Sequence, residues 1–131
     1  MAQSSSFEPY ALSLLRIAAG FTFTLHGVQK LFGAFGGVGH GAAAHFLSLM
    51  WIAGVIETIG GPLILLGLYT RPVAFVLCGE MAVAYFRQHI PRGFWPIANG
   101  GEPAVLYCFI FLLLVSAGAG PWSLDRAVRK K

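Results

Sequence analysis

Ionisable residues lie inside the apolar runs of this 131-residue chain. Arg16, His26 and Lys30 lie within or at the end of the first run, Glu57 lies in the second and Glu80 in the third. A charge at bilayer depth costs at least about 2.5–3.5 kcal/mol on insertion scales, so such residues usually face a bundle interior or a wet cavity. The pattern therefore indicates a polar site inside a membrane, which binds a polar ligand or transfers protons.

These residue types divide into two candidate roles. We expect the following residues to transfer protons, because histidine changes its charge near neutral pH and carboxyl groups exchange protons readily: His26, Glu57 and Glu80. We expect a second group, whose side chains make strong charged hydrogen bonds, to bind a polar ligand: Arg16, Lys30, His89, Arg92 and Glu102. The alternative is that the buried charges form structural ion pairs, which fix the register of the helices.

The depth of each charge along its helix predicts which charges meet. At 1.5 Å per residue, Glu57 lies about 20 Å and His26 about 24 Å from the cytoplasmic end of their helices. Glu80 lies about 12 Å and Arg16 about 9 Å from the same end. Depth alone therefore predicts two pairs, Arg16 with Glu80, and either His26 or Lys30 with Glu57.

The first apolar run places its charges and two glycines on one helical face. Arg16, Gly20, Phe23, Gly27 and Lys30 fall within roughly 80° of one another at 100° per residue. Glycines on a helix face allow a neighbouring helix to come close, so the charges should point at that neighbour. For Lys30 the alternative is a side chain that reaches along the helix to the membrane interface.

The composition indicates lipid as the surrounding solvent. Hydrophobic residues make up 56% of the chain and charged residues only 11%. A soluble domain carries roughly 25% charged residues. The length suits a single domain, which we take to be residues 1–131.

The apolar runs are long enough to be membrane-spanning helices, which need about 20 residues each. They lack the period-two alternation of barrel strands and are rich in Leu, Ala, Phe and Gly. The expected spans are 10–32, 46–69, 72–88 and 103–120. The sequence thus predicts an all-α integral membrane protein, folded as a four-helix transmembrane bundle.

The basic residues predict the orientation of that bundle. With four spans, the side that holds both termini carries Arg71, Arg126, Arg129, Lys130 and Lys131. The opposite side carries Lys30, Arg87 and Arg92 near helix ends. The positive-inside rule then places both termini in the cytoplasm. A basic tail beside a membrane helix favours an anionic lipid leaflet as its partner, and we expect no binding of nucleic acid.

Metal and disulfide chemistry have little support in the sequence. The histidines and glutamates show no HxxxH or HxxE spacing on one helix, so we expect no metal site. Cys78 and Cys108 lie in separate apolar runs without CxxC spacing. They are expected to be buried thiols that fill space in the core.

Several short motifs, in order along the chain, resemble those of the DoxX family of small membrane proteins. They are Leu15-Arg16, Gly20 and HGVQKLFG at 26–33, ETIGGP at 57–62 and GLYTRP at 67–72, Gly93-Phe94, NGGE at 99–102 with Tyr107, and finally Gly118, Gly120, Ser123 and Asp125. The resemblance runs from about Tyr10 to Arg126. It implies a four-helix, multi-pass protein of the bacterial cytoplasmic (inner) membrane.

The resemblance also implies a redox context. The family is named for its association with a membrane thiosulfate:quinone oxidoreductase, and some members are linked to oxidative-stress and thiol-redox complexes. Wider relatives oxidise thiols with quinones through paired redox cysteines. Cys78 and Cys108 lie on different expected helices and depart from that motif.

We therefore expect a membrane subunit of a redox system linked to quinones, thiols or sulfur compounds, with quinone as the expected ligand. His26, Lys30 and Arg16 would hydrogen-bond its headgroup, while Glu57, Glu80 and His89 would form a proton path. Electrons would come from a partner protein or a substrate, so whether the chain is an oxidoreductase subunit with activity of its own stays open.

Two other functions are compatible with the same residues. One is a non-catalytic assembly or accessory subunit, whose glycine faces dock a larger membrane complex. The other is a carrier of small solutes or protons, for which four helices are few unless the chain forms a homo-oligomer. The expected partners are the lipid bilayer and either another protein of a membrane complex or a second copy of the chain.

Overall fold

A computed structural model describes residues 6–129 of the chain. Lys130 and Lys131, which entered the charge count, and residues 1–5 of the expected domain lie outside the described residues. Within residues 6–129 the ordered elements are helical and no strand is formed beyond one isolated bridge. In chain order they are α1 Glu8–Phe32, η1 Ala34–Gly36, α2 Leu49–Leu66, α3 Thr70–Ala84, η2 Tyr85–His89, η3 Ile90–Arg92, α4 Pro96–Asn99, α5 Glu102–Ala117 and α6 Leu124–Arg129.

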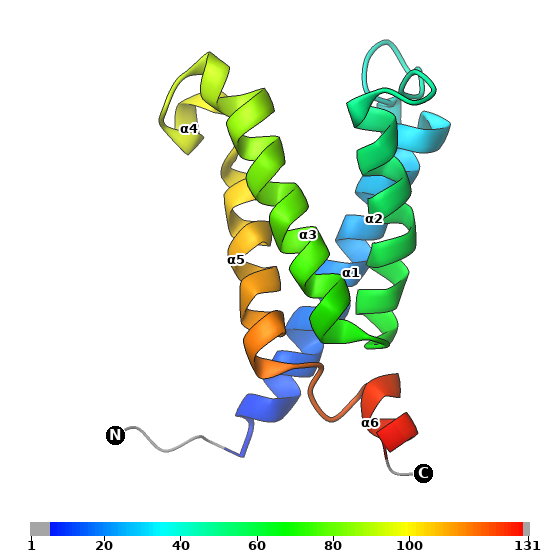
Figure 1. Ribbon diagram of the computed structural model, residues 1–131, viewed down its shortest axis with the longest axis vertical. Helices are drawn as coiled ribbons and strands as arrows, with labels where there is room; N and C mark the ends of the chain where they lie inside the picture. The colour runs from blue at the N-terminus through cyan, green and yellow to red at the C-terminus, as the bar shows by residue number, and fades with distance from the viewer. Residues whose placement is uncertain (1–5, 130–131) are drawn as a thin grey trace.

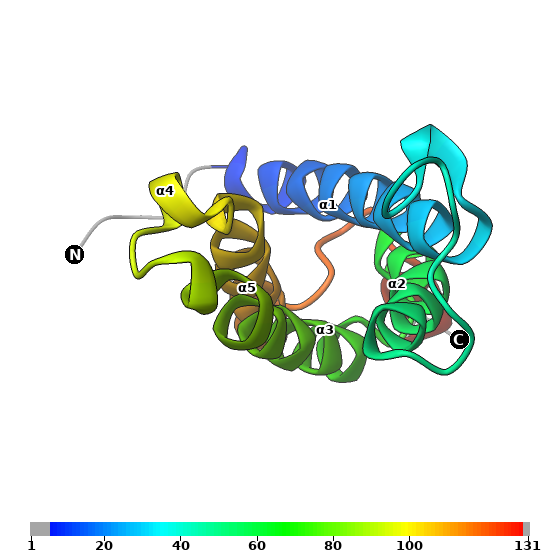
Figure 2. The ribbon, with the colours of Figure 1, turned by 90° about the horizontal axis from the view of Figure 1, so that it is seen from above.

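The longer helices stand around a common centre, as Figure 2 shows from above. α1 packs along α2, α3 packs along α5, and α2 also contacts α3. α3 continues without a break into η2, a single π-helical turn (Figure 1). With this extension, the helix ends agree with the expected ranges to within three residues.

Two of these helices are long and apolar enough to cross a membrane on length and composition. They are α1, with 25 residues, and α2, with 18 residues. α5 is also apolar but shorter, at 16 residues. Large hydrophobic side chains are exposed on all the longer helices, among them Phe21, Ile59, Phe75 and Phe109. An apolar surface of this extent is typical of contact with lipid.

Close contact between α1 and α2 depends on glycines, as the sequence predicts. A Cβ atom built on Gly20 would lie 2.9 Å from the carbonyl oxygen of Gly61. A Cβ atom on Gly27 would lie 2.5 Å from the backbone nitrogen of Thr58. No side chain fits at these distances, so the two backbones approach as closely as they do because these residues are glycines.

The turn between α2 and α3 is short and is held by the C-terminal segment. Gly67 follows the last residue of α2 in the left-handed conformation (φ 70°), and its N–H donates to the carbonyl oxygen of Ile64. The first N–H groups of a helix have no partner inside it. Here Asp125 supplies the partner, because its carboxylate accepts hydrogen bonds from the N–H groups of Tyr69 (2.7 Å) and Thr70 (2.9 Å).

At the opposite end, a compact cap connects η2 to α5. Asn99 holds it together, donating to the carbonyl of Gly93 (2.8 Å) and accepting from the N–H of Gly101 (2.8 Å). Tyr85 donates its hydroxyl hydrogen to the carbonyl of Phe94 (2.6 Å). Asn99 is fully buried, so these bonds order the connection and position the residues at its base.

Candidate functional site

A cavity of about 250 Å³ lies between the helices, below the cap. Its polar lining includes five of the predicted site residues, which lie on α1, α2, α3 and η2: His26, Lys30, Glu57, Glu80 and His89. Its apolar part includes Phe23, Met50, Met81 and Ala104. All three residues expected to transfer protons thus line one cavity.

Lys30 and Glu57 form an ion pair at this cavity. The Nζ atom of Lys30 lies 2.7 Å from Oε1 and 2.5 Å from Oε2 of Glu57. The Glu57 side chain is 1% exposed and that of Lys30 is 18% exposed. Gly54 makes room for the lysine stem, since a Cβ atom there would lie 2.9 Å from Cβ of Lys30. Of the two pairings predicted for Glu57, with His26 or with Lys30, the structure shows the one with Lys30, and the alternative of a lysine reaching away to the interface is wrong.

Glu80 lines the same cavity without a partner of its own. Within residues 6–129, neither of its buried carboxyl oxygens accepts or donates a hydrogen bond. A neutral carboxyl group donates one hydrogen bond and accepts others, whereas a carboxylate only accepts. Either form offers unused hydrogen-bonding capacity to a molecule in the cavity.

The predicted pairing of Arg16 with Glu80 is wrong. Arg16 is 1% exposed, and its guanidinium binds backbone carbonyls far from the cavity. It donates to the carbonyls of Ile64 (2.9 Å), Leu65 (3.3 Å), Trp122 (2.6 Å) and Ala119. Ile64 and Leu65 belong to the last turn of α2, whose carbonyls have no partner within the helix. Arg16 therefore caps α2 and ties it to the C-terminal segment.

The reason for this error is the level at which the helices begin. Arg16 lies eight residues after the start of α1 and is level with the last turn of α2. α1 thus begins about two turns, or ~12 Å, beyond the end of α2. Pairing charges by equal depth requires helices that start at the same level, and α1 and α3 do not.

His26 lies beside an aromatic residue that the sequence analysis did not assign to the site. The rings of His26 and Tyr107 meet edge to face, with centroids 5.8 Å apart. Tyr107 lines the cavity and donates its hydroxyl hydrogen to Oγ1 of Thr22 (2.6 Å). The available signal was a tyrosine within an otherwise apolar run, since a buried tyrosine hydroxyl needs a hydrogen-bond partner.

His89 is held at the cavity by the cap. Its Nδ1 atom lies 3.2 Å from the carbonyl oxygen of Asn99, and its ring stacks on Tyr85 at a centroid distance of 6.1 Å. A hydrogen bond from Nδ1 to this carbonyl leaves Nε2 as an acceptor in the neutral ring. The cap thus orients a histidine that the sequence placed only near the mouth of a cavity.

Arg92 and Glu102 do not line the cavity. Arg92 lies in η3 and is exposed. Glu102 is exposed in the first turn of α5, where a negative charge stabilises the helix dipole. It lines a separate pocket of about 400 Å³ between α1 and α5. Together with Arg16, these are the predicted ligand-binding residues that the structure leaves outside the cavity.

The two cysteines lie next to each other, which their spacing in the sequence did not reveal. The Sγ atoms of Cys78 on α3 and Cys108 on α5 are 3.7 Å apart. Both thiols are free and partly buried against the hydrophobic core. Because α3 and α5 are antiparallel neighbours, residues 30 positions apart become a contacting pair.

The chain is similar to a family of membrane proteins and to individual bacterial proteins. The family model described as DoxX matches residues 11–90. An uncharacterized protein of Haemophilus influenzae is 45% identical over 130 residues, covering 95% of this chain and 96% of its own length. An uncharacterized membrane protein of Mycobacterium tuberculosis is 30% identical over 140 residues, covering 94% of this chain and 84% of its own length. No solved structure matches the chain. The family match covers more than half of the chain, and the chain therefore belongs to the DoxX family and is a membrane protein.

Proposed function

We propose that this protein crosses the bacterial cytoplasmic membrane four times, with both termini in the cytoplasm. α3 extended by η2 reaches His89 and so is longer than α2. α5, at about 24 Å, is close to the roughly 30 Å thickness of the hydrocarbon core. Arg71, Arg126 and Arg129 lie at the end opposite the cap, and the positive-inside rule assigns that end to the cytoplasm.

Within this membrane frame, the proposed function is that of a redox-system subunit which binds the headgroup of a quinone in the central cavity. The observation that carries the proposal is the unpartnered carboxyl group of Glu80, beside the ion pair of Lys30 and Glu57. Unpaired polar groups at membrane depth are costly, and they usually mark a ligand or proton site.

The cavity fits the chemistry of such a headgroup. A quinone presents two carbonyl oxygens on an apolar ring, and so needs hydrogen-bond donors within a mostly apolar lining. Lys30 and His26 carry donor groups, and Phe23 and Met81 supply apolar surface. A volume of about 250 Å³ is smaller than the 300–1,000 Å³ typical of pockets for whole drug-sized molecules. The cavity suits a ring, with an isoprenoid tail left in the lipid.

Each residue has a defined part in this proposal. A bound quinone would supply the capacity to accept two electrons and two protons. Glu57 fixes the ammonium group of Lys30, which donates to a carbonyl oxygen of the ligand. Glu80 and His26 hold exchangeable protons on opposite sides of the cavity lining, on α3 and α1. His89 lies at the cap end of the same cavity, where it connects these groups to the outer surface.

A binding titration tests this proposal. The purified protein in detergent is titrated with a short-tailed 1,4-benzoquinone, and the heat of binding is measured. We expect Glu80→Gln and His26→Ala each to weaken binding by about tenfold or more. His40→Ala, in the exposed loop before α2, is the matched control and should bind as the wild type does.

The result also separates this function from that of an assembly subunit. His26 is exposed and makes no hydrogen bond within residues 6–129, so its loss should leave the melting temperature unchanged. Weaker binding without a change in melting temperature supports the ligand site. If no variant alters binding, or if the wild type binds no quinone at all, the cavity residues serve the assembly of a larger complex and the proposal is wrong.

A further inference from the structure

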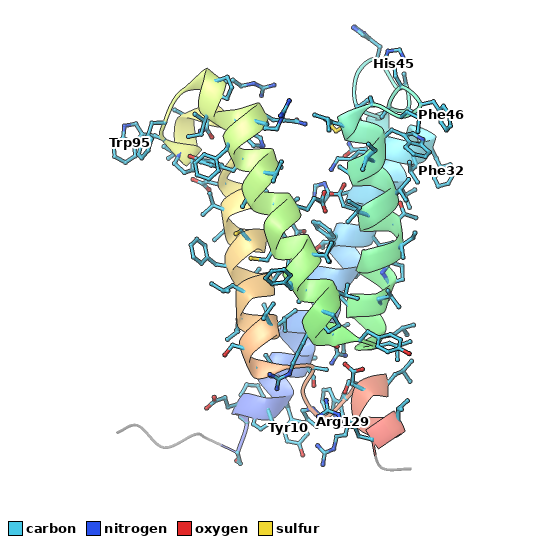
Figure 3. All side chains as sticks on the ribbon, viewed as in Figure 1. Tyr10, Phe32, His45, Phe46, Trp95 and Arg129 are labelled. Atoms are coloured by element: carbon cyan, nitrogen blue, oxygen red, sulfur yellow. The ribbon has the colours of Figure 1, made fainter. Side chains whose placement is uncertain are left out.

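A further pocket, larger than the central cavity and than the pocket between α1 and α5, lies at the end of the molecule opposite the cap. Its volume is about 890 Å³, and α1, α3, α5, α6 and the segment between α5 and α6 all contribute to it. Figure 3 shows Tyr10 and Arg129 at this end, while Trp95 and His45 mark the other. None of the residues assigned to the central cavity lines this pocket.

The pocket combines positive charge with an apolar wall. Arg71, Arg126 and Arg129 contribute guanidinium groups, and Glu8 contributes the one negative charge among the lining residues. Leucines from α1 and α5 form the apolar wall: Leu12, Leu15 and Leu113. The pocket is thus amphipathic, with a net positive charge.

The guanidinium groups retain donors for a ligand. Nη1 of Arg71 donates to the carbonyls of Ser116 (3.0 Å) and Val115 (3.4 Å), which fixes the side chain across the end of α5. Its Nε and Nη2 atoms make no hydrogen bond within residues 6–129 and lie over Gly118, where a Cβ atom would stand 3.2 Å from Nη2. Within the same residues, neither Arg126 nor Arg129 forms an ion pair.

The level of the pocket matches that of lipid headgroups. The rings of Tyr10 and Trp122 pack together beside it, with centroids 5.1 Å apart. Tyrosine and tryptophan gather where hydrocarbon meets headgroups. Leu113 is exposed on α5 and continues the apolar wall onto the surface that faces lipid.

We propose that this pocket binds one anionic phospholipid of the surrounding membrane. Arg71 receives the phosphate oxygens, since a guanidinium donates two parallel hydrogen bonds to such a group. Arg126 and Arg129 add positive charge at the rim, and the acyl chains run along Leu12, Leu15 and Leu113. The volume lies within the 300–1,000 Å³ range of ligand pockets and accommodates a headgroup with its glycerol. This site does not depend on the quinone proposal.

Native mass spectrometry in detergent tests this site, with phosphatidylglycerol and phosphatidylcholine of the same acyl chains as probes. We expect one phosphatidylglycerol to be retained per chain, with a preference over phosphatidylcholine of about tenfold. Arg126→Gln with Arg129→Gln should reduce that preference strongly, because it removes two positive charges from the rim, and both side chains are exposed. Glu8→Gln should raise it, because it removes the opposing charge. Melting temperatures establish that each variant is folded.

The matched control is Arg87→Gln with Arg92→Gln, which removes the same charge from exposed positions at the cap end. This control should keep the wild-type preference. Equal retention of both lipids would overturn the proposal, because the pocket would then not select an anionic headgroup. An equal loss in the control would also overturn it, because the attraction would then be one of net charge alone. Displacement of the lipid by millimolar inorganic phosphate would also overturn it, since the pocket would then be a site for a free anion.

Discussion

Lys30 on α1 and Glu57 on α2 are joined by an ion pair at the central cavity, with Nζ 2.7 Å and 2.5 Å from the two carboxylate oxygens. The carboxylate is almost wholly buried, while the lysine is partly exposed. The pair therefore does two things at once. It links the two helices that share the most extensive contact in the fold, and it presents a charged group to the cavity.

Removing one partner of this ion pair should destabilise the protein more than removing both partners. Lys30→Ala leaves the Glu57 carboxyl buried and unpaired, and we expect a loss of stability of about 3 kcal/mol in detergent. The double variant Lys30→Ala with Glu57→Ala removes that isolated charge and should recover part of the loss. Chemical unfolding followed by circular dichroism gives both values. Additive losses in the double variant would mean that the two residues are not coupled.

Even a conservative substitution of Arg16 should destabilise the protein. Its guanidinium donates to four carbonyls in α2 and the C-terminal segment, whereas the ammonium group of a lysine has three donors and no planar fork. Arg16→Lys should therefore destabilise the protein by at least about 2 kcal/mol. Arg92→Lys, at an exposed position, should change little. Equal melting temperatures for the two variants would contradict the role assigned to Arg16.

The free energy of unfolding should depend on pH through the carboxyl group of Asp125. Burial raises the pKa of its carboxyl group, but hydrogen bonds from the N–H groups of Thr70 and Tyr69 and the charge of Arg129 outweigh this, so the pKa lies below its ordinary value of 3.8. A pKa lowered by folding stabilises the protein above the unfolded value, and this contribution is lost as the pH falls through the folded value.

The substitution Asp125→Asn isolates this contribution. We expect the variant to be less stable than the wild type by about 1 kcal/mol at neutral pH, because the anionic cap of α3 is lost. The difference in unfolding free energy between the wild type and this variant should become smaller below a pH of about 4. There the wild-type carboxyl group becomes protonated and is neutral, like the amide of the variant. A difference that is constant across this range would show that the charge of Asp125 does not stabilise α3.

Cys78 and Cys108 give a direct test of how α3 packs on α5. Their Sγ atoms are 3.7 Å apart, and a disulfide needs about 2.05 Å, so a small side-chain movement joins them. Treatment with copper phenanthroline should abolish maleimide labelling of both thiols without forming dimers on a gel. Cys78→Ser should leave Cys108 reactive to maleimide after the same treatment. Cross-linked dimers, or unchanged labelling of the wild type, would contradict this packing.

The helices and the cavity residues were predictable for different reasons. Apolar runs of about 20 residues predict helices well, because a bilayer forces the backbone to satisfy its hydrogen bonds internally. Depth reduced the partner of Glu57 to His26 or Lys30, and Gly20 and Gly27 mark the α1 face that contacts α2, but it is the structure that identifies Lys30. Adjacent antiparallel helices that meet along a known face leave few choices of partner.

The remaining parts depend on information that spacing does not contain. Arg16 was misassigned because the sequence does not say that α1 begins beyond the end of α2. Tyr107 and the contact of Cys78 with Cys108 depend on the rotation of α5 against α1 and α3, and α5 is apolar on nearly every face. A helix without a polar face gives no signal of its rotation.

The proposed quinone site can be tested by measuring which lipids and quinones accompany the protein when it is extracted gently from its own membrane. The purified complex is extracted with organic solvent, and quinones are quantified against protein. We expect about one quinone per chain in the wild type, lost in Glu80→Gln and His26→Ala and retained in His40→Ala. A wild-type protein that carries no quinone, or one that carries equal amounts in all the variants, would contradict it.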